Sequence, residues 1–291
     1  MVFKALEQLL PIIDPPIVVG VSGGVDSMAL LHAMMENGYC PIAGHFNHQL
    51  REESDQEASF IKEYCLEAGL PFREGSGDVN QFSMEMGYSI EEAARILRYQ
   101  FLFQVAVKEM AGAVAVAHHA DDQVETILMN LLRGAGTKGL AGMQVVSIPN
   151  PWNDTIPLIR PFLEIDKKEL ISYQVEHKLP LMEDPSNQEE IYFRNKIRLK
   201  LIPLMNALTP GFQHRLLQTS QILAAEDQAL EYFCDLAWKS CLNSQGASYI
   251  QLSRADLLDY PVAMQRRLIR KALKCLRPDY LELSYNQVEG A

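Results

Sequence analysis

The chain has 291 residues, of which 48% are hydrophobic and 22% are charged, and its formal net charge is −11. This composition is typical of a globular protein with one large domain and a smaller one. The negative charge argues against a general nucleic-acid-binding protein. No apolar run approaches the roughly 18 residues that a membrane span needs, and the N-terminal segment MVFKALEQLLPIIDPP lacks the features of a secretory signal. We therefore expect a cytoplasmic protein with no membrane association.

The five cysteines of the chain include no CxxC pair. An odd number without close pairs disfavours a disulfide framework, and it disfavours a zinc or iron–sulfur site built from such pairs. We expect reduced thiols that pack as small hydrophobic side chains.

Strand-like and helix-like segments alternate along the first half of the chain. Apolar runs predict strands over residues 17–21, 41–46, 71–74 and 113–117. Helical patterns lie over residues 26–36, 56–68, 90–110 and 121–132, and the third of these has Ser89 as its N-cap. Strands that alternate with helices form βαβ units, so the pattern predicts an α/β fold with a Rossmann-like parallel sheet.

The second half of the chain reads as helical. Helices are predicted over residues 166–177, 192–204, 212–240 and 261–276, and no convincing series of strands continues. The Thr209-Pro210-Gly211 breaker suggests a boundary. We therefore predict a catalytic domain over residues 1–206 and a smaller all-helical domain over residues 207–291.

The first strand ends in a loop that is suited to binding phosphate. Glycines let the backbone turn sharply, and the first N–H groups of the following helix attract an anion. An acid within such a loop suggests a divalent cation, and we assign Mg²⁺ to it. An ordinary turn with an acid at a helix N-terminus is the alternative. The loop consists of Ser22, Gly23, Gly24, Val25, Asp26 and Ser27.

A second polar cluster follows the strand predicted over residues 113–117. It reads HHADDQVET, in which Asp122 and Glu125 are three residues apart and share one face of a helix. Because the carboxyl ends of parallel strands meet at one edge of the sheet, this pair should lie near the phosphate loop. Two carboxylates on one face suit an ammonium group or a metal, and a solvated acidic face is the alternative.

Four further motifs carry candidate site residues. His45 follows the second strand in the motif GHFNHQLR, which could also be a loop with surface histidines. Arg95 and Arg98 share a helix face and could clamp phosphate or carboxylate, or form surface ion pairs. Lys138 lies in a glycine-rich loop that is mobile by composition. The last motif, EDPSN followed by YFRNKIR, contains Arg194, Asn195 and Arg198.

Two segments are rich in basic residues and free of acids, in contrast to the negative net charge. They cover residues 191–215 and 261–277. They are either solvated helix faces or surfaces for a phosphate backbone.

These motifs together resemble a known family. The chain contains no GxxxxGK[ST], so the lysine of a Walker loop is absent. The loop SGGVDS resembles that of the PP-loop pyrophosphatase superfamily, whose members cleave ATP between the α and β phosphates. The motifs HxxHxLR, SxEEAARxxRY, HHADDQxET, RGxGxxGLxGM and DxSN…YxRNxIR resemble, in this order, those of the bacterial tRNA(Ile)-lysidine synthetases. The resemblance runs from about residue 17 to residue 206.

The resemblance implies an adenine nucleotide alpha hydrolase-like fold and a ligase that attaches L-lysine to carbon 2 of the wobble cytidine of tRNA(Ile) with a CAU anticodon. By resemblance, ATP would bind at Ser22–Ser27 and His45, with Mg²⁺ near Asp26. The implied catalytic residues are Asp26, Arg98, Asp122 and Glu125. The implied substrate-binding residues are Arg95, Arg98, Asp122, Glu125, Lys138, Arg194, Asn195 and Arg198.

Two other functions fit part of the pattern. A PP-loop tRNA thiolase shares the phosphate loop, but such enzymes often use cysteine pairs or an iron–sulfur cluster, and the motifs above contain no cysteine. A non-catalytic nucleotide-sensing or tRNA-binding module would not need the acids Asp26, Asp122 and Glu125. The sequence does not predict an oligomeric state.

Overall fold

The computed structural model describes residues 2–9, 13–49, 54–182, 193–277 and 285–290. The chain divides into two compact units. The first comprises Met1–Ala135 and Gly142–Gln218, and the second comprises Gly136–Ala141 and Thr219–Ala291. The boundary predicted between residues 206 and 207 therefore falls inside the first unit, and the division into a catalytic and a tRNA-binding domain stays a prediction.

A six-stranded sheet forms the centre of the first unit, with the strand order β3-β2-β1-β4-β6-β5. All neighbouring strands pair in parallel except β5, which is antiparallel to β6. This confirms the predicted α/β fold. Strands β5 and β6 are only two residues long, too short to stand out as apolar runs. The strands are β1 Ile17–Gly20, β2 Ile42–Asn47, β3 Phe72–Ser76, β4 Ala113–Ala115, β5 Val146–Ser147 and β6 Leu158–Ile159.

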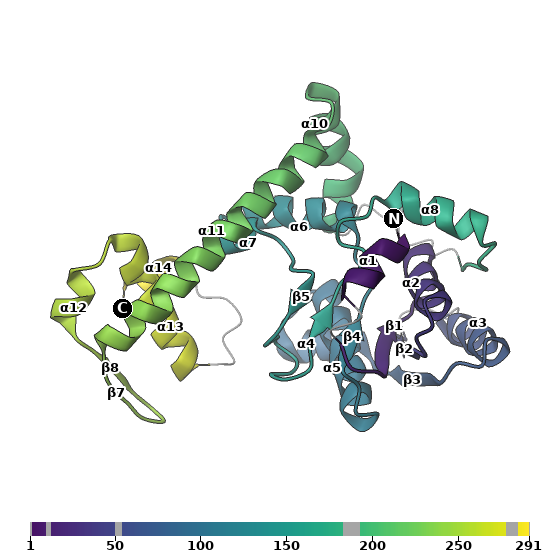
Figure 1. Cartoon of the computed structure of the whole chain (residues 1–291), viewed down its shortest axis with the longest axis horizontal. Helices are drawn as coiled ribbons and strands as arrows, with labels where there is room; N and C mark the ends of the chain where they lie inside the picture. The colour runs from purple at the N-terminus through teal and green to yellow at the C-terminus, as the bar shows by residue number, and fades with distance from the viewer. Residues whose placement is uncertain (1, 10–12, 50–53, 183–192, 278–284, 291) are drawn as a thin grey trace. The chain divides into compact units, whose positions relative to one another are not determined.

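Helices cover both faces of this sheet. Helices α1, α2, α3 and α8 bury apolar residues on one face, and α5 does so on the other (Figure 1). Ser89 caps α5 as predicted, because its hydroxyl oxygen accepts a hydrogen bond from the Glu92 N–H at 3.2 Å. The helices of this unit that precede residue 180 are α1 Val2–Leu9, α2 Val25–Glu36, α3 Ser54–Glu67, α4 Val79–Met86, α5 Ile90–Lys108, α6 Ala120–Leu132 and α8 Lys167–Glu176.

Strand β1 shows how the sequence builds this sandwich. Its alternate residues point to opposite faces, so Ile17 and Val19 join one apolar cluster and Val18 joins the other. Helix α5 packs so closely that a Cβ atom on Gly44 of β2 would lie 2.6 Å from a methyl carbon of Leu102. A glycine at this position therefore permits close packing of the helix against the sheet.

The strand order creates a switch point between β1 and β4. The chain leaves β1 towards β2 and β3 on one side, and β4 continues the sheet towards β6 on the other. Ligands of open parallel sheets bind at the carboxyl ends of the strands at such a point. The phosphate loop follows β1 and the HHADD motif follows β4, so the topology brings these two motifs together.

The segment after residue 192 is helical but interrupted. It consists of α9 Phe193–Lys196, the π-helical turn η3 Ile197–Leu201 and α10 Ile202–Leu208. The sequence predicted one continuous helix here. Pro203 lies in the first turn of α10 and has no N–H group, so it cannot continue the hydrogen-bond pattern of the preceding turn. Ile197 and Ile202 pack against Val124 and Leu128, which anchors the segment on helix α6.

The second unit is mainly helical, as predicted, with one addition. Helix α11, Phe212–Cys241, passes from the first unit into the second, where Cys234, Ala237 and Cys241 pack against Leu268. A hairpin of β7 and β8 follows α11, and it was not predicted. Its polar strand sequence LNSQ lacks an apolar run. The remaining elements are α7 Thr137–Leu140, β7 Leu242–Gln245, β8 Ile250–Leu252, α12 Arg254–Leu258, α13 Val262–Leu276 and α14 Tyr285–Glu289.

None of the helices in the described ranges combines the length and the apolar character that a membrane crossing requires.

Candidate active site

The loop after β1 has the geometry of an anion cradle. Gly23 has a φ of 80°, a left-handed conformation that favours glycine. Gly24 is the N-cap of α2, and no side chain caps that helix end. Ser27 Oγ donates to the Gly24 carbonyl at 3.1 Å and accepts from the Ser22 N–H at 3.1 Å, which holds the loop closed on itself. Because a Cβ atom on Gly24 would meet only the Ser22 hydroxyl, at 3.7 Å, the cradle has room for a phosphate.

Asp26 lies at the centre of a charged contact. The ammonium of Lys167 donates to both of its carboxylate oxygens, at 2.5 and 2.7 Å. The Nε2 atom of the buried His119 lies 3.7 Å from Asp26 Oδ2 and 3.4 Å from Asp122 Oδ2. His119 thus bridges the phosphate loop and the start of helix α6, which confirms that the two motifs meet at one edge of the sheet.

The predicted carboxylate pair is joined by two arginines. Glu125 is 1% exposed, and its two oxygens accept from Nε of Arg194 and from Nε of Arg198, both at 2.6 Å. Arg194 also donates to Asp122 Oδ1 at 3.1 Å. The carboxylates that sequence analysis assigned to lysine are therefore neutralised by the arginines that it assigned to substrate binding. All four are in one cluster, but the arginines do not form a separate surface.

The pKa values in this cluster follow from its charges. Burial by itself would raise the pKa of Asp122, but His119 and Arg194 outweigh burial and hold it below its ordinary value. Burial would lower the pKa of Arg194, yet Asp122 and Glu125 raise it. Asp122 is consequently ionised at neutral pH, and Arg194 is a permanent cation.

Several ring and guanidinium nitrogens near this edge are buried without a hydrogen-bond partner. They include Nε2 of His45, Nδ1 of His48, Nδ1 of His118 and Nε of Arg98. Burial, together with Arg98 and His45, lowers the pKa of His48 to about 4. Burial lowers the pKa of His118 to about 3, even though Asp122 opposes the shift. Because buried polar atoms normally have partners, these nitrogens favour a polar ligand at this edge.

His45 shows the chemistry of this edge most clearly. Its Nδ1 atom lies 3.0 Å from the carbonyl oxygen of Val21, so Nδ1 carries the proton and donates it. Burial lowers the pKa of His45, so the ring is neutral at pH 7 and its unpartnered Nε2 is a hydrogen-bond acceptor. An adenine or cytosine amino group has the complementary donor.

The residues support a nucleotide better than a preformed metal site. The glycine cradle and the unpartnered nitrogens fit a nucleotide with phosphates and a base. Among the described residues, no group of three or more His, Cys, Asp or Glu side chains could hold a metal ion. The predicted Mg²⁺ ligand, Asp26, is paired with Lys167.

Three predicted residues take no part in the ion pairs of this cluster, and one predicted motif is not described. Arg95 is exposed on α5. Burial is the main cause that lowers the pKa of Arg160, and the charge of Arg95 adds to it. Lys138 is exposed on α7 of the second unit. Asn195 is buried on α9. The EDPSN motif, residues 183–187, lies outside the described residues.

Lys167 and His119 are site residues that sequence reasoning did not assign. His119 was noted only as part of a motif. Lys167 lies in the segment after β6. Because β6 is only two residues long, the sequence did not predict it and gave no reason to place that segment at the edge of the sheet. The signal that could have found Lys167 is its position directly after Asp166, the N-cap of helix α8.

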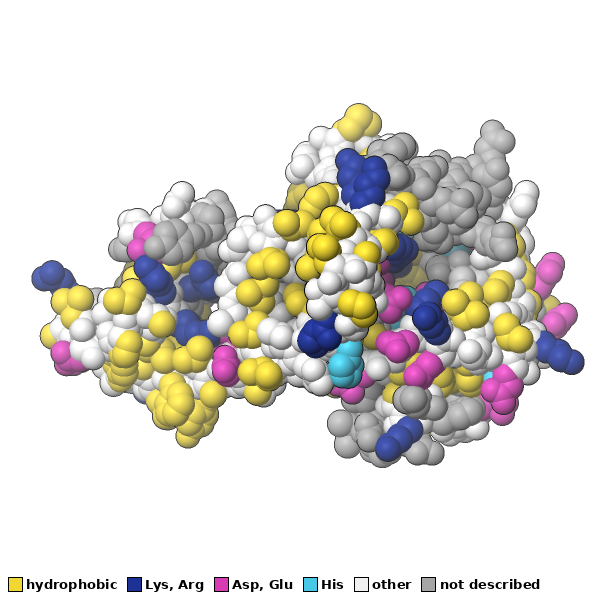
Figure 2. All heavy atoms as spheres, turned by 90° about the horizontal axis from the view of Figure 1, so that it is seen from above, with side chains coloured by type: hydrophobic (Ala, Val, Ile, Leu, Met, Phe, Trp, Pro, Cys, Tyr) yellow, Lys and Arg dark blue, Asp and Glu magenta, His cyan; other side chains and the backbone are white. Residues whose placement is uncertain are grey.

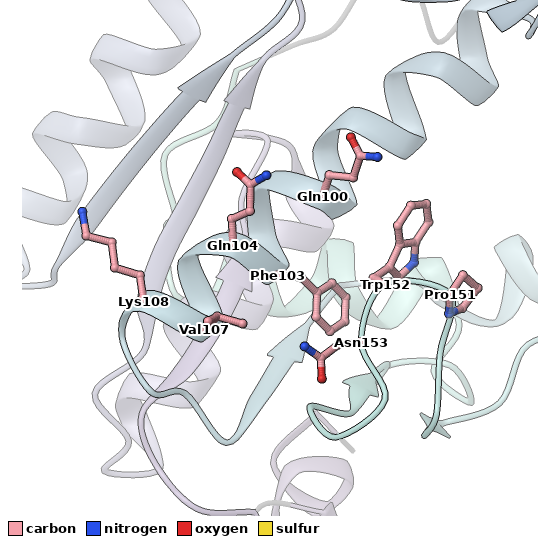
Figure 3. A pocket seen from close by; sticks show the side chains of 8 residues that line it. All are labelled: Gln100, Phe103, Gln104, Val107, Lys108, Pro151, Trp152 and Asn153. Atoms are coloured by element: carbon pink, nitrogen blue, oxygen red, sulfur yellow. The ribbon is translucent and has the colours of Figure 1, made fainter. Parts of the chain in front are cut away.

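A separate open cavity of about 660 Å³ lies on the outer side of helix α5 (Figure 3). Gln104 and Lys108 of that helix line it together with Trp152 and Asn153. None of the predicted site residues lines this cavity. The candidate site is therefore assigned from its charged and polar side chains and not from this cavity.

Comparison with known proteins identifies the family of this chain. The family model described as PP-loop domain matches residues 3–205. The chain is 38% identical over 262 residues to a tRNA(Ile)-lysidine synthase of Geobacillus kaustophilus (strain HTA426), covering 88% of this chain and 55% of that protein. It is 36% identical to a tRNA(Ile)-lysidine synthase of Bacillus subtilis (strain 168), covering 89% of this chain and 55% of that protein. The chain thus spans about half the length of these curated relatives.

A solved structure shows the same fold at low sequence similarity. The U34-tRNA thiolase NcsA from Methanococcus maripaludis, determined with its iron–sulfur cluster, aligns with a TM-score of 0.63. The identity is 17%, and the alignment covers 76% of this chain and 78% of the thiolase. This similarity supports the fold alone. The family match covers the phosphate loop, the carboxylate pair and most of the chain, and the protein therefore belongs to the PP-loop domain family.

Proposed function

We propose that the protein is a tRNA(Ile)-lysidine synthetase, which uses ATP to attach L-lysine to carbon 2 of the wobble cytidine of tRNA(Ile) with a CAU anticodon. The observation that carries the proposal is the contact of one side chain, His119, with both the phosphate-loop Asp26 and the carboxylate Asp122. The activated carbon 2 of the cytidine and the lysine amine must meet at one place. The contacts of His119 join the phosphate loop to the carboxylate pair.

ATP would supply an adenylyl group that turns the carbon 2 oxygen of the cytidine into a leaving group, with release of pyrophosphate. The glycine cradle at Gly23 and Gly24 would hold the phosphates, and the His45 acceptor would face a base amino group. Arg98, whose Nε is buried and unpartnered, is suited to a phosphodiester or the departing pyrophosphate.

Asp122 and Glu125 would bind the ammonium of the substrate lysine. A free lysine amine has a pKa of roughly 10.4, so it enters as a cation and must lose a proton before it attacks. Asp122 is ionised at neutral pH because its pKa is lowered, which suits binding of an ammonium more than uptake of a proton. His119, 3.4 Å from Asp122, is the neighbouring group that can accept this proton. Arg194 and Arg198 occupy the same carboxylates, so lysine has to compete with them.

Mg²⁺ would bind at Asp26 with nucleotide phosphates completing its oxygen ligands, since Mg²⁺ usually combines one or two carboxylates with phosphates and water. For the tRNA, the basic residues of α13 and its C-cap that have no ion pair in the described structure are the candidates for phosphate contacts. They are Arg270, Lys274 and Arg277, and each is exposed.

The test is release of pyrophosphate by the full chain with ATP, lysine and bulk bacterial tRNA. We expect release that requires tRNA, and release that is indifferent to tRNA would contradict the proposal. Asp122→Asn should keep tRNA-dependent pyrophosphate release but lose incorporation of labelled lysine, because the amide cannot pair with the ammonium. Normal incorporation by this variant would refute the assigned role of Asp122.

A tRNA thiolase is the second candidate, because the same fold carries that activity in the archaeal protein. The described candidate site contains no cysteine: Cys65 and Cys234 are buried in apolar clusters, and burial raises the pKa of the Cys65 thiol to about 11. A thiol with so high a pKa is a poor nucleophile at neutral pH. Incorporation of sulfur rather than lysine into the tRNA would favour this candidate.

A further inference from the structure

Lys167 reaches the phosphate loop from a distant part of the chain. Strand β6 lies beside β4 in the sheet, and the segment that follows β6 carries Lys167, the first residue of α8. Its ammonium contacts both oxygens of Asp26 at 2.5 and 2.7 Å, and its side chain is 31% exposed. A lysine that is this exposed and has a flexible stem can change partners at little cost.

The charges around the loop explain why such a cation is needed. The loop lacks the lysine that a Walker loop directs at the terminal phosphates, and it carries Asp26, which repels phosphates. Two of the other cations near this edge, Arg194 and Arg198, are engaged by Asp122 and Glu125. Among the described residues, Lys167 is therefore the lysine or arginine of this cluster that pairs with the phosphate loop itself.

The position of Asp26 places that ammonium close to the cradle. Asp26 lies in the first turn of α2, two residues after the N-cap Gly24. One residue of a helix rises about 1.5 Å, so a group that contacts the Asp26 carboxylate lies within one side-chain length of the cradle's N–H groups. A phosphate bound at those N–H groups would compete directly with Asp26 for Lys167.

We propose that Lys167 is the phosphate-binding lysine of this protein, which pairs with Asp26 in the free enzyme and moves to a phosphate oxygen of the bound nucleotide. In this arrangement α8 supplies from another strand of the sheet the ammonium that the loop sequence lacks. The exchange leaves the Asp26 carboxylate free for a cation that arrives with the nucleotide. The inference rests on the proposed use of ATP but not on the identity of the tRNA product.

A competing account makes the opposite prediction. If Lys167 only neutralises Asp26 in the free enzyme, its removal would leave binding of a magnesium nucleotide unchanged or tighter, because a competitor has gone. If Lys167 binds phosphate, its removal would weaken that binding. The sign of the change in affinity therefore separates the two accounts.

The experiment measures binding of α,β-methylene-ATP with Mg²⁺ by calorimetry, using the full chain. We expect Lys167→Met to weaken binding about 10- to 100-fold, as loss of a charge-assisted hydrogen bond implies. Adenosine, which has no phosphate, should bind Lys167→Met and the wild type equally. Lys167→Arg keeps the charge and should restore part of the affinity, and it tests the proposal if the methionine variant does not fold.

Lys168→Met is the matched control. Lys168 is the adjacent residue on α8, is exposed, and has no ion pair among the described residues, so its removal should leave the affinity unchanged. Unchanged or tighter nucleotide binding by Lys167→Met would overturn the proposal, as would an equal loss of adenosine affinity. Normal nucleotide binding by the wild type without tRNA-dependent pyrophosphate release would instead count against the proposed tRNA reaction.

Discussion

The two basic segments of this chain look alike in sequence and differ in structure. In the first, Arg194 and Arg198 bind Glu125, a carboxylate that is 1% exposed. In the second, Arg266 of α13 pairs with Glu289, and the two side chains are 42% and 38% exposed. Arg267 of α13 lies between these extremes. It pairs with Asp227, and the two side chains are 15% and 12% exposed.

The comparison shows that a run of basic residues does not by itself make a phosphate-binding surface. Acids that are distant in sequence, such as Glu125 and Glu289, meet these cations in the folded chain. On the face drawn in Figure 2, Lys and Arg side chains lie among hydrophobic and acidic ones and form no continuous basic surface. What each arginine contributes depends on the burial of its partner, because water and salt screen an exposed pair.

The largest effect should come from the buried pair. Arg194→Met leaves Glu125 with one arginine and removes a partner of Asp122, and it should cost about 2–4 kcal/mol of unfolding free energy. Urea denaturation can be followed by the fluorescence of Trp152 in the first unit, in a background in which Trp238 is replaced by Phe. A loss of unfolding free energy below about 1 kcal/mol would mean that Glu125 has access to water. It would contradict the expected difference between the buried and the exposed ion pairs.

An intermediate effect is expected at Arg267. It donates to Asp227 at 2.5 Å and to Glu231 at 2.7 Å, and Asp227 also accepts from Thr137 at 3.1 Å. Arg267→Met should lower the unfolding free energy by about 1–3 kcal/mol. The largely buried carboxylate of Asp227 then keeps the hydrogen bond from the Thr137 hydroxyl but loses its arginine partner. The measurement is urea denaturation followed by Trp238 in a Trp152→Phe background. A cost equal to that of Arg266→Met would show that burial does not decide the difference.

A smaller effect depends on pH. The pKa of Asp122 is lowered on folding, so its ionised form stabilises the protein above its ordinary pKa, near 4. That stability is lost as the pH falls through the folded value. The difference in melting temperature between wild type and Asp122→Asn should therefore be full at pH 6 and should shrink below pH 4. A difference that stays constant down to pH 3 would contradict the pairing.

The smallest effect should come from the exposed pair. Arg266→Met should change the unfolding free energy by at most about 0.5–1 kcal/mol, because exposed ion pairs contribute little. If α13 binds tRNA, Arg270→Glu should in addition weaken tRNA affinity and flatten its salt dependence, whereas Arg266→Glu should do so less. Equal tRNA binding by both variants and the wild type would exclude α13 as a phosphate surface.

The sequence predicted most of the fold and part of the site. Apolar runs located β1, β2 and β4, and capping chemistry located the start of α5 at Ser89. The phosphate loop and the Asp122–Glu125 pair were recognisable because both lie within a few residues of a predicted strand end. The hairpin of β7 and β8 and the two-residue strand β6 were missed because short or polar strands have no periodicity to detect.

The sequence by itself determined which residues form the glycine loop between β1 and α2, since strand, glycines and helix start are continuous in the chain. Only the tertiary structure decided which charges meet there. Lys167 pairs with Asp26, and Arg194 and Arg198 pair with Glu125, because the order of strands and the packing of η3 on α6 bring distant segments together. Ion pairs depend on distances in space of a few ångströms, which spacing along the chain does not encode.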